Sequence, residues 1–143
     1  MTAATSHTSP ARTAAAQRRI HRGGAILAAM ALNAVLWGIA SLFGADFVLT
    51  DPSGTGVVTL FVAVIFTAIF GLLGWGLLAV LERFTGRRAS AIWTGVAIAV
   101  ALLSIVPIFL EGASTATRVA LTVLHLAVAV VLVPAFRLDR NAR

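Results

Sequence analysis

A single histidine, His125, stands inside the last long apolar stretch of the sequence. It follows Arg118 by seven residues and Thr122 by three, so these side chains share one face of a helix. Seven helical residues cover about 10 Å, which puts His125 near the middle of a membrane-spanning segment. Ionisable groups at that depth usually face the interior of a helix bundle. We therefore predict an intramembrane polar cluster around His125.

Two interpretations of His125 are open. It could act as a proton relay or bind a ligand, as ionisable groups within membrane spans often do. Alternatively, a neutral imidazole could donate one hydrogen bond to a neighbouring helix and hold the bundle together. The sequence has no carboxylate at matching depth, which favours the structural interpretation. No metal site is predicted, because His7 and His21 both lie in the N-terminal segment.

Asn33 and Glu111 complete the predicted cluster. Asn33 lies about ten residues into the first apolar stretch and close in depth to His125, so we predict a hydrogen bond between them across the bundle. Glu111 and Arg118 bracket a short turn and could pair across it, which for an exposed pair contributes about 0–1 kcal/mol. Glu82 is predicted to be an ordinary solvated helix end.

Four apolar runs must position these residues. Each has roughly the 20 residues that cross a hydrocarbon core of about 30 Å, and each must be helical because its backbone has to satisfy its own hydrogen bonds. The short linkers require neighbouring helices to run antiparallel. The predicted fold is an all-α integral membrane four-helix bundle with up-down topology. Its helices span about residues 24–43, 57–81, 91–110 and 116–133.

The remaining segments are predicted to lie outside the membrane. Residues 1–22 are rich in Thr, Ser, Ala and Arg and are predicted to form a disordered basic cytosolic tail ahead of a transmembrane domain of residues 23–137. Residues 138–143 form a second short cytosolic tail. Within the third apolar run, Pro107 is predicted to bend the helix because proline removes a backbone hydrogen bond.

Composition excludes a water-soluble enzyme. Hydrophobic residues make up 59% of the 143, and charged residues only 11%, whereas soluble domains carry about 25% charged residues. All eleven basic residues are arginines, and the net charge is +6. They form short clusters between the apolar runs rather than one basic surface, so nucleic-acid binding is not expected. The sequence has no cysteine, which excludes thiol chemistry and disulfides.

The arginines also predict the orientation. If the four runs cross a membrane alternately, ten arginines fall on the side of both termini and only Arg118 on the other side. Because arginine-rich segments stay in the cytosol, we predict a multi-pass plasma-membrane protein with both termini in the cytoplasm.

One face of the second predicted helix is made of small side chains at intervals of four residues: Thr59, Ala63, Thr67 and Gly71. Small residues let helix backbones approach closely in lipid. We interpret this face as a packing seam rather than a substrate groove. The sequence leaves open whether the seam joins helices of one chain or of two.

The second half resembles a known family. The segments WGLLAVLER, IWTGVAIAVALLSIVPIF and TATRVALTVLHLAVAVVLVPAFR resemble an uncharacterised actinobacterial family of small membrane proteins with four transmembrane helices. The resemblance covers roughly Arg22 to Arg137 and implies a four-span bundle, but no activity, cofactor or substrate. Its most recognisable residues are Glu82, Trp93, Ser104, Thr117, His125 and Pro134.

The sequence contains no catalytic motif, phosphate-binding loop or paired deep carboxylates, so no enzymatic activity or cofactor is expected. The leading prediction is a non-enzymatic accessory or interaction protein, whose partners are the lipid bilayer and either copies of itself or another membrane protein. The alternative is a small oligomeric transporter or channel. Its polar path would be lined by His125, Thr122, Arg118 and Asn33.

Overall fold

The computed structural model describes residues 10–138 and is mostly helical, which confirms the predicted all-α class. Its long helices are α1 (Pro10–Leu42), α2 (Leu60–Thr85), α3 (Ala89–Leu103) and α5 (Thr115–Leu138). The short elements are a β-hairpin of β1 (Val48–Asp51) and β2 (Gly54–Val57), the 3-10 turn η1 (Gly86–Arg88) and the short helix α4 (Val106–Leu110).

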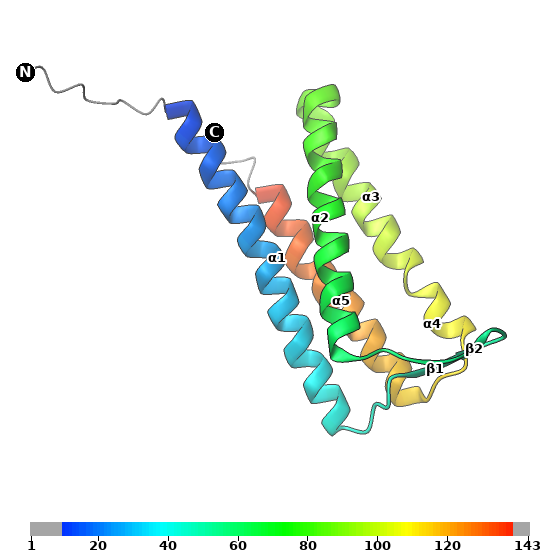
Figure 1. The fold of residues 1–143 in the computed structure, drawn as a ribbon. Coiled ribbons are helices and arrows are strands. Elements are labelled where there is room, and N and C mark those ends of the chain that lie inside the picture. The colour runs from blue at the N-terminus through cyan, green and yellow to red at the C-terminus, as the bar shows by residue number, and fades with distance from the viewer. Residues whose placement is uncertain (1–9, 139–143) are drawn as a thin grey trace, which may run out of the picture.

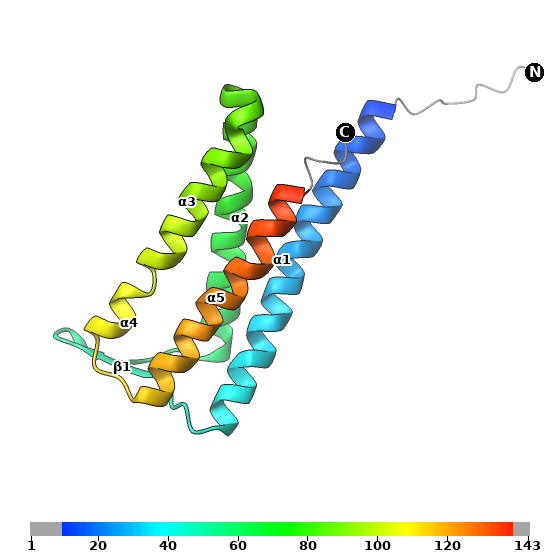
Figure 2. The ribbon, with the colours of Figure 1, turned by 180° about the vertical axis from the view of Figure 1, so that it is seen from behind.

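The long helices pack side by side. Helix α1 lies against α2 and α5, and α3 lies against the same two helices. Figures 1 and 2 show the start of α1, the turn η1 and the end of α5 at one end, and the hairpin at the other. We call these the arginine end, after Arg22, Arg87 and Arg137, and the hairpin end.

Three helical stretches of the described chain are long and apolar enough to cross a membrane: Ala14–Leu42, Leu60–Leu110 and Thr115–Arg137. Length and apolar character of this kind are typical of a membrane protein. The middle stretch contains α2, η1, α3 and α4. It turns at η1, where Gly86 has a φ of +51°, a conformation that favours glycine.

Several predicted boundaries were wrong. The first helix begins at Pro10, so residues 10–22 continue it rather than forming a disordered tail; residues 1–9 lie outside the described part. Alanine and arginine have high helix propensity, which lets the helix continue beyond the apolar run. The last helix likewise continues past residue 133 to Leu138 and contains Pro134. The second tail, apart from Leu138, also lies outside the described residues.

The third predicted helix is divided into α3 and α4, with the break at Ser104 and Ile105. The proline two residues later cannot donate to the carbonyl of Leu103, which explains the break. This confirms that Pro107 interrupts the helix. Ser104 donates to Ala101 O at 2.8 Å.

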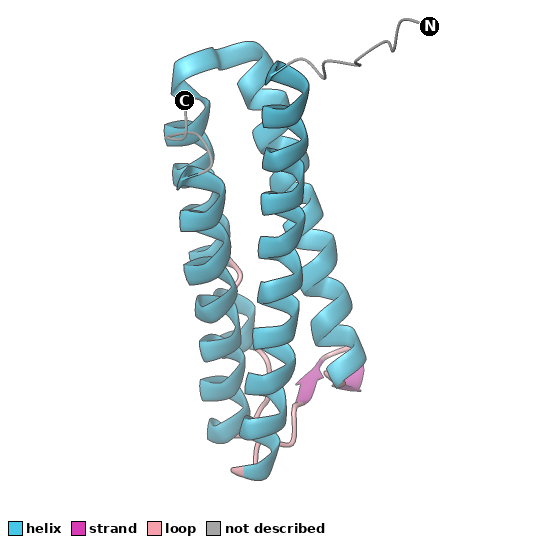
Figure 3. Ribbon diagram, turned by 90° about the vertical axis from the view of Figure 1, so that its left-hand side faces the viewer, coloured by secondary structure: helices cyan, strands magenta, loops and turns pink. Residues whose placement is uncertain are grey.

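The linker between the first two apolar runs forms a hairpin that hydropathy did not predict. Its strands are antiparallel, and a turn at Asp51 joins them, in which Asp51 Oδ1 accepts hydrogen bonds from Ser53 N and Gly54 N. Strand β1 also contacts the connection after α4, where Thr50 N donates to Gly112 O at 2.8 Å and Gly112 N to Thr50 O at 2.7 Å. The hairpin is visible from the side in Figure 3. The second helix therefore begins at Leu60 rather than at 57.

Two hydrophobic clusters form the core, one in each half of the bundle. The cluster toward the arginine end is built around the buried residues Ala29, Leu78, Trp93, Leu132 and Phe136. The cluster toward the hairpin end is built around the buried residues Phe47, Ile108, Ala120, Leu121 and Leu124. Most large apolar side chains outside these clusters are exposed on the outer surface, as expected where lipid covers it.

Candidate functional site

A layer of polar residues separates the two hydrophobic clusters. Asn33 of α1 and His125 of α5 lie between positions of their own helices that belong to or pack against the two clusters. The hairpin-end cluster has no residue on α2 or α3; there, Thr67 and Ser104 lie between residues of the other cluster and Val58 or Ile108, which lie just outside these helices. We call this set the mid-bundle polar layer; its members are Asn33 of α1, Thr67 of α2, Ser104 at the end of α3 and His125 of α5.

Asn33 and Thr67 join α1 to α2. Asn33 Nδ2 donates to Thr67 Oγ1 at 2.7 Å, and Thr67 Oγ1 donates to Ala63 O at 2.8 Å. Both residues are 5% exposed. The predicted hydrogen bond between Asn33 and His125 is therefore wrong, because the Asn33 amide is oriented toward α2. Its Oδ1 atom is buried and accepts no hydrogen bond from the described residues.

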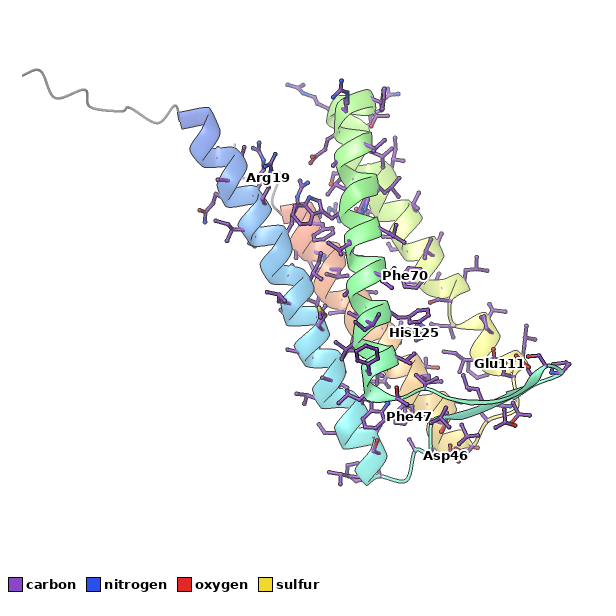
Figure 4. All side chains as sticks on the ribbon, viewed as in Figure 1. Arg19, Asp46, Phe47, Phe70, Glu111 and His125 are labelled. Atoms are coloured by element: carbon purple, nitrogen blue, oxygen red, sulfur yellow. The ribbon has the colours of Figure 1, made fainter. Side chains whose placement is uncertain are left out.

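His125 bonds to its own helix. Its Nδ1 lies 2.7 Å from Leu121 O. Because a carbonyl oxygen only accepts, Nδ1 carries the hydrogen in the neutral ring, and Nε2 remains an acceptor. This differs from the structural interpretation of the sequence, in which the imidazole bonds to a neighbouring helix. Figure 4 shows His125 along α5, with Asp46 and Glu111 nearer the hairpin end.

Two contacts define the register between α5 and the α3–α4 segment. Arg118 bonds to the carbonyl of Glu111 near the hairpin end, and Trp93 packs on Phe136 near the arginine end. Between these two contacts, α5 and the α3–α4 segment cover equal numbers of residues and run in opposite directions. The same register brings His125 to the level of Ser104, where α3 ends.

The other two predicted cluster residues of α5 also bond locally. Thr122 Oγ1 donates to Arg118 O at 2.8 Å. Arg118 Nη2 donates at 3.0 Å to the backbone carbonyl of Glu111, so the predicted bond across the turn does not involve the carboxylate. Arg118 Nε is buried and makes no hydrogen bond with the described residues. Arg118, Thr122 and His125 thus share one side of α5, but no hydrogen bond joins the side chain of one to the side chain of another among the described contacts.

The small-residue seam lies within the chain. Ala63, Thr67 and Gly71 are buried on α2. A Cβ atom added at Gly71 would lie 3.1 Å from Ile26 Cγ1 of α1, so the Ile26 side chain packs into the space that the glycine leaves open. This confirms the packing interpretation for these three residues, which lie at the contact between α1 and α2. Thr59 is exposed and is instead the N-cap of α2, where its side chain accepts from Val62 N.

Sequence reasoning missed an ion pair at the arginine end. Arg22 Nη2 lies 2.7 Å from Glu82 Oε1, and Arg22 Nη1 donates to Oε2 at 3.3 Å. Arg22 is 5% exposed. Glu82 is therefore bound to α1 rather than being an ordinary solvated helix end. The only sequence signal was a carboxylate among arginines.

A second missed feature is a hydrogen-bonded clasp at the hairpin end, formed by Asp46, Phe47, Ser114 and Thr117. Thr117, which is fully buried, donates to Asp46 Oδ1 at 2.6 Å and accepts from Phe47 N at 2.9 Å. Ser114 Oγ accepts from Thr117 N at 3.2 Å, so Ser114 is the N-cap of α5. The hydrogen bond from Thr117 and that from Val48 N lower the pKa of Asp46 below its usual value.

Phe47 is held in an uncommon backbone conformation by the clasp. Its φ is +54°, which is rare for a residue with a side chain. Its ring is 1% exposed and stacks on Trp37 with centroids 5.0 Å apart. Trp37 Nε1 donates to Val58 O at 3.0 Å. The aromatic pair thus fixes both ends of the hairpin against α1.

Comparison with known proteins identifies the family of this chain but no activity. The chain belongs to a family of unknown function, DUF6069, which it matches over residues 13–142. No curated protein and no solved structure matches it.

Proposed function

We propose that the protein crosses the plasma membrane four times, with both termini in the cytoplasm. Support comes from the described arginines: those of α1, the α2–α3 corner and the end of α5 all lie toward the arginine end, whereas Arg118 alone lies toward the hairpin end. Segments rich in arginine are retained in the cytosol. The actinobacterial origin that the family resemblance implies stays a prediction.

The cysteine-free chain allows a direct test of this orientation. Single cysteines at Ser53 and Arg87 would be treated with a membrane-impermeant maleimide on intact cells. We expect labelling at position 53, and labelling at position 87 only after the cells are permeabilised. The reverse pattern would contradict the proposed orientation.

We propose that the protein is a non-enzymatic accessory protein that contacts another membrane protein through its hairpin. The observation that carries this proposal is the exposed strand β2. All four of its residues, Gly54–Val57, are exposed and uncharged, and β2 pairs only with β1 among the described elements. A free, uncharged strand edge favours pairing with another chain. The clasp and the Thr50–Gly112 bonds hold that edge in a fixed position.

A photoreactive amino acid at Thr55 tests the accessory role. We expect a discrete crosslinked protein in native membranes. The same group at Leu103, which is 69% exposed on the apolar surface of α3, is the control and should yield mainly lipid adducts. Thr55 adducts confined to lipid, with the protein recovered alone, would contradict the role.

A second candidate, a small oligomeric transporter, is favoured by one observation: the α3–α4 break lies at the level of His125. Discontinuous helices near the membrane midplane line binding sites in many transporters. Purified protein in liposomes would be tested for proton flux beside His125→Ala. Flux that disappears in the variant would support transport, and equal flux in both proteins would exclude a role for His125.

A further inference from the structure

The mid-bundle polar layer presents three hydrogen-bond acceptors at one level of the bundle. Asn33 Oδ1 is buried and accepts no hydrogen bond within residues 10–138. His125 Nε2 is left as an acceptor because Nδ1 bonds to Leu121 O.

The helix break adds further acceptors. Ser104 donates its hydroxyl hydrogen to Ala101 O, so its oxygen can still accept a hydrogen bond. Pro107, which has no N–H, leaves the carbonyl of Leu103 nearby without its helical donor.

The layer offers few hydrogens in return. The hydroxyl hydrogens of Thr67 and Ser104 are directed to carbonyls of their own helices. Asn33 Nδ2 donates to Thr67 Oγ1 at 2.7 Å and to Ala63 O at 3.4 Å, which uses both of its hydrogens. A molecule that binds to these groups must therefore donate hydrogen bonds, preferably two.

The charged residues nearest the layer favour a neutral bound molecule. On α5 the charged group nearest to His125 is Arg118, which would repel a cation. Helices α3 and α4 contain no charged residue, Glu111 follows α4 at the hairpin end, and the charged groups of α1 and α2 lie toward the arginine end. Water is the small neutral molecule that donates twice, and buried waters usually bind groups that otherwise lack partners.

We propose that the mid-bundle polar layer is a hydration site that water enters from the hairpin end. Arg118 marks the entrance: its buried Nε–H has no partner among the described residues and lies on the flank that leads through Thr122 to His125. Water there accepts from Arg118, and water at the layer donates to His125 Nε2, Ser104 Oγ and Asn33 Oδ1. His125 then sits at the inner end of a hydrated path that opens on the hairpin side. This site does not depend on a partner at the hairpin.

Single cysteines test the site, because a thiol reacts only as the thiolate, which forms in contact with water. Thr122→Cys and Ser104→Cys would be compared with Leu103→Cys and Val123→Cys, whose positions face outward at 69% and 45% exposure. With a small neutral thiol reagent, we expect the first two to react about tenfold faster than the controls. An impermeant reagent added from the hairpin side should reach Thr122→Cys before Ser104→Cys.

Either of two results would overturn the proposal: Ser104→Cys reacting no faster than Leu103→Cys, or modification only from the arginine side. If a cysteine variant does not fold, nitrogen NMR of His125 in the unsubstituted protein decides. The proposal requires magnetisation transfer from water to Nε2, and its absence would overturn it. Neither result affects the Thr55 crosslink, so the accessory role succeeds or fails separately.

Discussion

The two ends of the bundle are held together by different means. At the hairpin end, the clasp joins the segment before β1 to the start of α5, and the Thr50–Gly112 bonds join β1 to the connection after α4. The stack of Phe47 on Trp37 holds the segment before β1 against α1. At the arginine end, the ion pair of Arg22 with Glu82 links α1 to α2, and Trp93 donates to Gly74 O and packs on Phe136.

This difference follows from what the backbone does at each end. At the arginine end the chain stays helical up to η1, so backbone groups are bonded internally and side chains supply the cross-links. At the hairpin end the chain leaves the helices, and its free N–H and C=O groups need partners from side chains and other strands. Substitutions at each end therefore separate the contribution of side-chain cross-links from that of bonds to the free backbone groups.

Removing the ion pair should have the largest effect. Arg22→Ala leaves Glu82 without its partner; because the Glu82 side chain is 33% exposed, we expect a loss of about 2–3 kcal/mol rather than the full cost of a buried charge. Unfolding in mixed detergent micelles measures it. Arg19→Ala, an exposed arginine of the same helix, is the control and should change stability little. Equal effects of the two substitutions would mean that the ion pair is not the cause.

Breaking the clasp should cost somewhat less. Thr117→Val keeps the side-chain shape but leaves the Phe47 N–H without an acceptor, for which we expect about 1–3 kcal/mol. Thr115→Val, two residues earlier on an exposed position, should be near neutral. The same unfolding assay applies, and a neutral Thr117→Val would show that the hydroxyl network does not stabilise this end.

The seam between the two ends gives a smaller effect. Gly71→Ala places a methyl group about 3.1 Å from Ile26 Cγ1, so we expect a loss of about 1 kcal/mol. Gly76→Ala meets no atom within 4 Å and should be neutral or slightly stabilising, since alanine is the better helix former. The free energies of unfolding of the matched pair decide. If Gly71→Ala were as stable as Gly76→Ala, close approach would not matter at the seam.

Acid should weaken the hairpin end alone, by the smallest amount. The hydrogen bonds from Thr117 and Val48 lower the pKa of Asp46 in the folded protein, and those from Ser53 lower the pKa of Asp51. Their stabilisation is therefore present above the ordinary aspartate pKa of about 4 and is lost as pH falls below it. Amide exchange in the hairpin, followed from pH 6 to about 3, measures the loss. Asp46→Asn with Asp51→Asn should flatten that dependence; an unchanged slope would contradict it.

Hydropathy and spacing predicted much of the architecture. Apolar runs of about 20 residues indicate helices because the backbone in lipid has no other way to satisfy its hydrogen bonds. Spacing of four residues also identified the seam, and Pro107 identified the break before α4. Counting residues along each helix also indicated that Asn33 and His125 lie between the two ends of the bundle.

Partners could not be predicted in this way. Periodicity tells which residues share a face, but not which helix that face meets, so Asn33 was assigned to His125 although it binds Thr67. The pairing of Arg22 with Glu82 joins residues 60 positions apart, and the clasp joins Asp46 to a threonine 71 positions later. Such contacts depend on the rotation and register of the helices, which only close packing of all the helices decides.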